Sequence, residues 1–465
     1  MSKSKSINNK NLSWAEKEFQ NVNIGDKRLN KRLTIIAEHF ENKPQAQIPQ
    51  AMGNFSNAKS AYRFFDNKKI TFDKIFAPHN SATIERLKGN NIILAIQDTT
   101  DLNYSSHPSV ANLGPAGNDT NRGFMLHPTI AVSTSNIPLG IIDFNIWVRD
   151  ENKSKKDYTN LPIEEKESYK WINSYIKSAK LEKKLKDVHF VNISDREGDI
   201  YGLFQKAQKT GDETKKPDIL IRAAQNRKVT HPQKYLWSYM KTQKVSGKRR
   251  VRVPRKKGKP EREAILFIRY AKVEIKSPRY NKKKKLSETI KLWAVYANEE
   301  NPPKEVEPIS WMLLTTMPIK NLEQAMEKIK WYMTRWMIEL FFKFLKSGCK
   351  VEARQLKNAE RLKNCIILDA IIAWRVMFLT YIGREVPDLP ASVIFDEYEW
   401  KALYSYINKN PRAPTKEPTL GEVIKMVAQL GGFLGRKNDG HPGMMTIWRG
   451  LTVLYYVSTT WKIFN

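Results

Sequence analysis

The stretch NIILAIQD, residues 91–98, is an apolar run that ends in a carboxylate. Apolar side chains at successive positions predict a central strand that is buried on both faces of a sheet. A second stretch, VHFVNISD at 188–195, has the same form. Because residues at the carboxyl ends of adjacent strands converge at one edge of a sheet, we expect Asp98 and Asp195 to lie together.

A helix is predicted over KIKWYMTRWMIELFFKFLKSG, residues 328–348, because the segment contains no proline and its only glycine is the last residue. At about 100° per residue, five polar side chains fall within an arc of about 80° on one face. They are Tyr332, Arg335, Glu339, Lys343 and Lys346. Alone, this stripe is equally typical of the solvated face of an amphipathic helix. A carboxylate among cations and a tyrosine can also hold a metal and a phosphate.

Asp98, Asp195 and Glu339 form a set of three carboxylates, two at predicted strand ends and one on a helix far downstream. Each of them alone is more often a cap or a turn residue. Three carboxylates at one sheet edge can bind two Mg²⁺ about 3.5–4 Å apart, which polarise a phosphodiester and activate water or a 3′-hydroxyl. Hard cations need no His or Cys ligand, which suits a chain with 7 His and 2 Cys.

The chain of 465 residues carries 80 Lys and Arg against 48 Asp and Glu, a net charge of +32. This charge predicts a polyanionic partner, and nucleic acid is the most obvious one. Ribosome-binding and membrane-surface proteins can be as basic, but they are usually shorter or carry a long basic tail. Two cysteines are too few for a disulfide framework or a zinc cluster and suit a reducing cytoplasm. We expect neither a signal peptide nor a membrane span.

The pattern changes along the chain and predicts three domains. Amphipathic spacing with basic faces predicts a helical DNA-binding domain at 1–80. A mixed α/β domain follows at 81–384, and within it β-type segments alternate with basic runs at about 224–312, which we interpret as a β-rich insertion with basic loops. A final helical domain is expected at 385–465. The basic runs are Lys248–Arg250, Arg255–Lys257 and Lys282–Lys285.

Several motifs, in their order along the chain, resemble the insertion-sequence-four family of DDE transposases, the group that contains the transposase of transposon Tn-five. They are IQDTTDLNY around Asp98, RGFMLH at 122–127, EKESYKW at 165–171, SDREGDI around Asp195, and the Y-R-E-K signature Tyr332-(2)-Arg335-(3)-Glu339-(6)-Lys346. NIGDKRLNKRL and AYRFFDN resemble the family's N-terminal domain, and GGFLGRKNDGHPGMMTIWRGL resembles its C-terminal region. The resemblance therefore covers nearly the whole chain.

The resemblance implies a ribonuclease-H-like mixed sheet with a β-rich insertion, flanked by a helical DNA-binding domain and a C-terminal helical dimerisation domain. It implies cut-and-paste transposition, in which transposon ends are cleaved through a hairpin and transferred into target DNA. Asp98, Asp195 and Glu339 would be the catalytic ligands of two Mg²⁺, for which Mn²⁺ can substitute. The implied partners are the terminal inverted repeats, target DNA and a second copy of the chain in the bacterial cytoplasm, with no membrane and no small-molecule substrate.

Other residues match DNA contacts of the family. Tyr332, Arg335 and Lys346 correspond to residues that grip the terminal phosphates, whereas Lys343 shares their face but is outside the signature. Trp311 corresponds to a tryptophan that caps a flipped base, and a strand-core aromatic is the alternative interpretation. The remaining candidates are Arg222, the end-binding Arg28 and Arg32, and Arg63, which lies one helical turn from Lys59.

Two alternatives stay open from the sequence. One is a ribonuclease-H-like nuclease without transposition, against which the end-binding motifs and Trp311 weigh. The other is a domesticated DNA-binding regulator, against which the complete triad and signature helix weigh.

Overall fold

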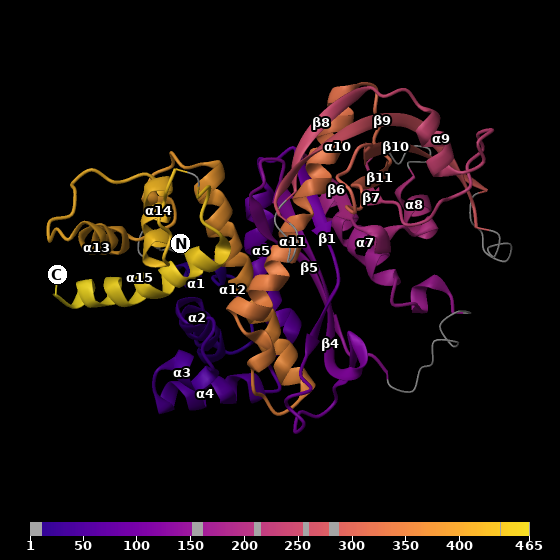
Figure 1. Ribbon diagram of the computed structural model, residues 1–465. Helices are drawn as coiled ribbons and strands as arrows, with labels where there is room; N and C mark the ends of the chain where they lie inside the picture. The colour runs from indigo at the N-terminus through magenta and orange to yellow at the C-terminus, as the bar shows by residue number, and fades with distance from the viewer. Residues whose placement is uncertain are drawn as a thin grey trace, which may run out of the picture.

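A single mixed sheet runs through the molecule (Figure 1). The computed structural model describes residues 12–150, 161–208, 215–253, 260–278, 288–437 and 439–464. The strands of this described part are β1 (Ile92–Gln97), β2 (Thr100–Asn103), β3 (Gly114–Ala116), β4 (Asn118–Ser133), β5 (Pro138–Trp147), β6 (His189–Ser194), β7 (Asp218–Arg222), β8 (Gly247–Val253), β9 (Arg262–Lys276), β10 (Thr289–Glu299) and β11 (Ser310–Thr315). Their order is β2-β4-β1-β6-β7-β11-β10-β9-β8, with β3 and β5 also paired to β4.

The helices surround this sheet. They are α1 (Trp14–Glu18), α2 (Lys27–Asn42), α3 (Ile48–Met52), α4 (Phe55–Asp66), α5 (Phe72–Leu87), α7 (Tyr169–Lys184), α8 (Tyr201–Ala207), α9 (Leu236–Thr242), α10 (Leu322–Thr334), α11 (Trp336–Lys343), α12 (Ala359–Glu385), α13 (Glu397–Asn408), α14 (Leu420–Leu430) and α15 (Met444–Phe464). Figure 1 shows the N-terminal helices in indigo beside the gold and yellow C-terminal helices, with β8–β10 at the opposite end. The architecture confirms the expected mixed α/β class with helical regions at both ends of the chain.

The centre of the sheet follows from its apolar runs. Strand β1 pairs in parallel with β6, and Ile96 lies opposite Ile193. Alternate residues of β1 point to opposite faces, so Ile93 packs in one core cluster and Leu94 in another. Burial on both faces explains why this strand carries no polar alternation.

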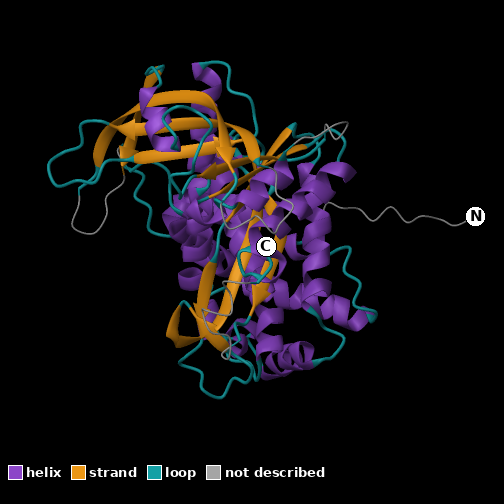
Figure 2. Ribbon diagram, turned by 90° about the vertical axis from the view of Figure 1, so that its right-hand side faces the viewer, coloured by secondary structure: helices purple, strands orange, loops and turns teal. Residues whose placement is uncertain are grey.

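The insertion continues the same sheet. Strand β11 pairs antiparallel with β7, with Leu313 opposite Arg222, and β10, β9 and β8 follow outward. Figure 2 shows the strands as one twisted band along the molecule, with helices packed beside it. The insertion is therefore hydrogen-bonded to β7, the neighbour of β6, and it belongs to the same sheet as the two strands that end at Asp98 and Asp195.

One of the predicted basic loops is in fact a strand. Lys248–Arg250 lies in β8, where Arg249 is half-buried and donates through Nη1 to the Met326 carbonyl at 3.2 Å. The pairing of β8 with β9 explains this placement. The runs Arg255–Lys257 and Lys282–Lys285 lie outside the described residues.

The first domain boundary falls inside a packed helix. Asp26 caps the N-terminus of α2, within the DNA-binding region. Helix α5, however, runs from Phe72 to Leu87 across the expected boundary at residue 80. It packs on β5 and α12, so its C-terminal half belongs to the core of the sheet domain.

Helix α12 forms the centre of the interface between the parts of the molecule. It has 27 residues and is long and apolar enough to cross a membrane by length and composition alone. It is mostly buried, and it contacts α2, α4, α5, β5, α14 and α15. Its hydropathy is that of a core helix that joins the N-terminal, central and C-terminal parts.

The C-terminal helices α14 and α15 pack closely because glycine lies at their contact. A Cβ on Gly450 would lie 1.7 Å from the carbonyl oxygen of Val427. Only a residue without a side chain permits this approach of one backbone to another.

The segment expected as one helix over 328–348 is helical throughout, but its hydrogen bonding changes twice. The Arg335 N–H donates to the Tyr332 carbonyl three residues back, at 3.1 Å, where α10 gives way to α11. A π-helical turn follows at 344–348, because the Cys349 N–H donates to the Phe344 carbonyl. Residues in this turn no longer follow the 100° spacing used for the prediction.

Candidate active site

Asp98 and Asp195 meet at the carboxyl ends of β1 and β6. Each directly follows its strand, and the two strands are parallel neighbours. The Asp195 carboxylate accepts from the Glu197 N–H at 2.9 Å, and the Asp98 carboxylate accepts from the Thr99 N–H at 2.8 Å. Local backbone N–H groups therefore orient both carboxylates.

The environment of Asp98 makes its negative charge costly. Burial, together with the nearby charge of Asp195, raises the pKa of Asp98 to about 6, against the opposing effect of Arg335. The two neighbouring carboxyl groups concentrate negative potential at one point of the sheet edge. Such a point attracts cations.

Arg335 joins the third carboxylate to this pair. Its Nη1 donates to Asp98 at 2.7 Å and its Nη2 donates to Glu339, one helical turn away, also at 2.7 Å. The side chain of Arg335 is only 13% exposed, so both bonds are shielded from water. The guanidinium thus brings residues 98 and 339 of the sequence into a single site.

The oxygen atoms of this site suit a hard divalent cation. In the part of the chain that the structure describes, no three His, Cys, Asp or Glu side chains already form a metal-binding group. The guanidinium of Arg335 lies between Asp98 and Glu339, which separates the third carboxylate from the first. The residue types fit the expected ion, with Arg335 as an additional member of the site.

Trp311 and Tyr332 lie together beside this site. Their rings meet edge to face with centroids 5.8 Å apart, and the Arg335 guanidinium is 5.9 Å from the Tyr332 ring. Tyr332 is buried, whereas Trp311 is half-buried at the start of β11. Arg222 donates to the Ser310 carbonyl at 2.9 Å and so fixes the strand next to the tryptophan.

Two family models match the ends of the chain. Residues 11–70, which include α1–α4, match the family described as transposase DNA-binding. Residues 371–460, which include α13 and α14 and most of α15, match the family described as transposase Tn5 dimerisation domain. The chain is a Tn5-like transposase of the insertion-sequence-four family. The transposase is accordingly an enzyme that cleaves or transfers DNA, with DNA and a second copy of itself as partners.

The two lysines of the signature face occupy different places in the transposase. Lys346 lies in the π turn, and its Nζ is 3.7 Å from Asp101, at the start of β2. Lys343 is exposed on α11. Tyr332, Arg335 and Glu339 therefore form the compact part of the predicted face, and Lys346 reaches the adjoining strand.

A buried histidine that the sequence prediction missed contacts the side chains of the two residues that flank Asp98. His127 lies 3.0 Å from the Thr99 hydroxyl and 3.1 Å from the Gln97 side chain, and its ring packs against Trp171 at 4.5 Å. Burial lowers the pKa of His127 well below its usual value, so the ring is neutral. Its signal was present in the motifs RGFMLH and EKESYKW, which meet here.

The N-terminal arginines lie on two helices of the DNA-binding domain. Arg28 is highly exposed at the start of α2, where it pairs with Asp26 at 3.1 Å, and Arg32 follows one turn later, half-buried. Arg63 is exposed on α4 with Lys59 one turn before it. The structure thus divides the predicted end-binding arginines between α2 and α4.

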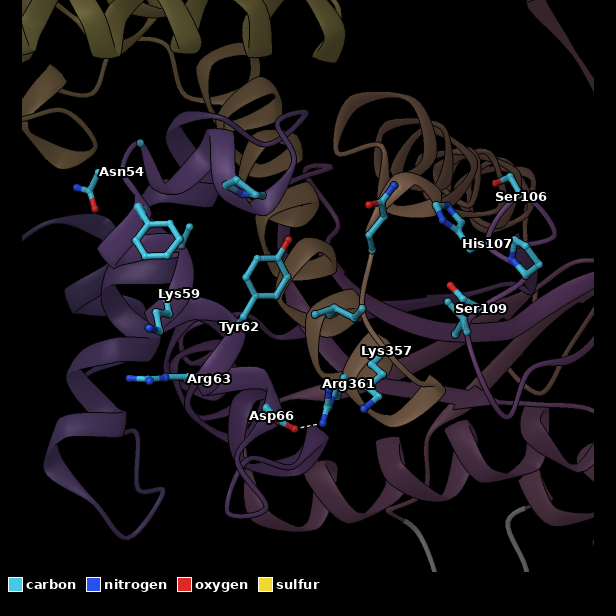
Figure 3. Close-up of a pocket in the computed structure, with 18 residues that line it drawn as sticks. Asn54, Lys59, Tyr62, Arg63, Asp66, Ser106, His107, Ser109, Lys357 and Arg361 are labelled. Atoms are coloured by element: carbon cyan, nitrogen blue, oxygen red, sulfur yellow. Dashed lines mark hydrogen bonds and ion pairs between the residues drawn. The ribbon is translucent and has the colours of Figure 1, made fainter.

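Arg63 and Lys59 line a groove between the DNA-binding domain and the catalytic domain (Figure 3). The groove has a volume of about 1110 Å³. Figure 3 shows α4 on one side and the loop that carries Ser106, His107 and Ser109 on the other.

Proposed function

We propose that this transposase excises DNA by metal-dependent cleavage of its terminal inverted repeats through a hairpin intermediate, followed by strand transfer into target DNA. One observation carries the proposal: two strand-end aspartates are neighbours, and Arg335 links one of them to Glu339. A nuclease without transposition would need the same carboxylates, but it would need neither the DNA-binding nor the dimerisation domain.

Asp98, Asp195 and Glu339 would hold the divalent metal, Mg²⁺ or Mn²⁺. When bound, two such ions would polarise the phosphodiester and favour ionisation of the attacking hydroxyl. The Asp98 and Asp195 carboxylates are already aimed by backbone N–H groups. His127 bonds to the side chains of Thr99 and Gln97, on either side of Asp98, and packs on Trp171, which limits movement of this strand end.

The cations of the site would hold the phosphates of the DNA. The Arg335 guanidinium presents a planar pair of donors beside the carboxylates, and Lys346 adds a second positive charge next to β2. A phosphate that competes for Arg335 would release Glu339 towards the two aspartates. In this proposal, Arg335 transfers its bonds from Glu339 to the DNA.

Trp311 supports the hairpin step. A hairpin requires a sharply bent duplex end, and flipping a base out of the stack relieves the bend. The half-buried indole lies against Tyr332, so part of its surface can receive a base while the rest is packed. Each protomer of the dimer would treat one transposon end in this way.

Cleavage of a linear DNA that carries the element's own flanking repeats tests the proposal. In Mg²⁺ we expect wild-type protein to release a hairpin-ended fragment, Glu339→Ala to release none, and the control Glu323→Ala, on the exposed start of α10, to match wild type. Nicked or blunt ends from wild type would support the nuclease alternative instead. Tight repeat-specific binding without any cleavage would support the regulator alternative.

A further inference from the structure

An exposed aromatic residue begins the helix that lines the groove. Phe55 is 80% exposed at the first position of α4, and Tyr62 on the same helix is 37% exposed. The buried face of α4 consists of Ala58, Ala61, Phe64 and Phe65. Phe55 lies on the outer face of this helix, so it does not contribute to the core and its ring is accessible to a ligand in the groove.

The exposed face of α4 combines this aromatic with cations. Phe55, Lys59 and Arg63 follow at intervals of four residues, and all three line the groove. The Lys59 ammonium lies 5.8 Å from the centre of the Phe55 ring. An apolar tip beside positive charges matches a ligand that is both anionic and aromatic, which is the chemistry of nucleic acid.

The opposite wall belongs to the catalytic domain and lies outside both family matches. It offers the Lys357 ammonium and the hydroxyls of Ser106 and Ser109. Arg361 pairs with Asp66 across the floor of the groove, as the dashed line in Figure 3 shows. Excess positive charge and hydroxyl donors on this wall are suited to phosphate oxygens.

The two walls are held in fixed positions. The buried Arg354 donates to the Pro44 and Ala46 carbonyls, and Gln47 donates to the Ala353 carbonyl at 2.7 Å. On the other side, His107 bonds to the Glu352 carbonyl at 2.9 Å. A groove whose walls are fixed before binding loses little entropy when a ligand enters.

We propose that this groove binds one strand edge of duplex DNA and that Phe55 reads a thymine there through the C5-methyl group. The inference rests on the proposed function for the identity of the DNA. Thymine is the base that presents a methyl group in the major groove, and apolar side chains recognise it by contact. Residues at the start of a recognition helix commonly reach base edges, which is the position of Phe55 on α4. Lys357 and the serine hydroxyls hold the backbone from the other wall.

The test is a thymine-to-deoxyuridine scan of a duplex that carries the element's flanking repeat, with binding followed by fluorescence anisotropy. Deoxyuridine removes only the methyl group. For wild type we expect one position at which the change weakens binding about fourfold, as for one buried methyl group. Phe55→Ala should weaken binding of the unmodified duplex and abolish the effect of deoxyuridine at that position alone. The control Ile265→Ala removes an exposed apolar residue of β9 and should leave the scan unchanged.

A second measurement tests the catalytic-domain wall. Lys357→Ala should weaken binding equally for all duplexes and reduce the slope of log affinity against log salt by about one. An unchanged slope would remove that wall from the proposal. A wild-type scan without any sensitive thymine, or one that Phe55→Ala leaves intact, would overturn the role of Phe55 while repeat-specific binding still stood. Absence of repeat-specific binding by wild type would instead overturn the proposed function.

Discussion

At the scale of single residues, the bridge made by Arg335 depends on the shape of its side chain. A guanidinium can donate from two nitrogens to two carboxylates at once, whereas an ammonium is a single point charge. The two bonds of 2.7 Å to Asp98 and Glu339 use this property.

Arg335→Lys should therefore reduce the single-turnover rate of DNA-end cleavage by about one hundred-fold, the usual effect of losing a placed donor. The melting temperature should change little, because the charge is retained. Arg250→Lys, at an exposed position of β8, is the matched control and should cleave normally. A normal rate for Arg335→Lys would show that the bridge is dispensable.

His189, at the start of β6, joins this strand to α7 and β7. Hydrogen bonds to Asp218 and Glu182 raise its pKa to about 9 from an ordinary value of 6.5. A pKa raised on folding stabilises the protein fully below the unfolded value, and the contribution is lost as pH rises through the folded value.

Stability should accordingly fall by about 1–3 kcal/mol between pH 6.5 and 9, allowing for the partial exposure of the ring. Chemical denaturation at a series of pH values would measure this change. His189→Asn should be less stable at pH 6.5 and should show a flatter profile over the same window. Equal slopes of unfolding free energy against pH for the two proteins would show that His189 does not cause the pH dependence.

At the scale of elements, the contact between α14 and α15 has the sharpest steric requirement. A Cβ at Gly450 would collide with the backbone of Val427, which cannot move without displacing α14. Gly443, just before α15, has open space around it.

Gly450→Ala should destabilise the C-terminal domain by about 1–3 kcal/mol or more, the usual cost of overpacking. It should also weaken the dimer, which sedimentation can measure beside thermal unfolding. Gly443→Ala should leave both unchanged. A fully stable, dimeric Gly450→Ala would show that the helices can separate without cost.

Elements whose signal is local could be predicted from the sequence. The apolar runs before Asp98 and Asp195 gave both strands and the edge at which they end. The bridge of Arg335 to Asp98 could not be predicted, because it joins residues 237 positions apart through side-chain conformations. The π turn that carries Lys346 was also missed, since 100° spacing presumes regular hydrogen bonds.

Pairing between distant strands was a further limit. The spacing of residues 224–312 predicted strands but gave no partner for β11, which joins β7 across about 90 residues of chain. His127 and Phe55 were missed for different reasons. A buried histidine has no periodic signal, and an apolar residue at a helix start looks like core until its exposure is known.

At the scale of the whole molecule, Arg354 connects the DNA-binding domain to α12. Its guanidinium pairs with the buried Asp369 at 2.6 Å and holds two carbonyls of the loop before α3. Arg354→Met should cost about 3–5 kcal/mol of unfolding free energy, because Asp369 keeps an unpaired buried charge.

Denaturant titration together with limited proteolysis would measure both the loss of stability and the release of the N-terminal helices. Asp66→Asn is the matched control, because it breaks the more exposed pair with Arg361 and should cost about 1 kcal/mol or less. A stable Arg354→Met with wild-type protease resistance would mean that apolar packing alone joins the domains.

The continuous sheet also fixes the distance between the catalytic carboxylates and Trp311. Asp195 and Trp311 are separated by two strand spacings sideways and about two residues lengthwise, roughly 12 Å in all from ideal strand dimensions. A hinged lid could close on DNA at variable positions, but hydrogen-bonded neighbours in a sheet cannot slide past each other. The number of nucleotides between the cleaved phosphodiester and the base that reaches Trp311 should therefore be set by the protein. It should be the same for every DNA end that the enzyme processes.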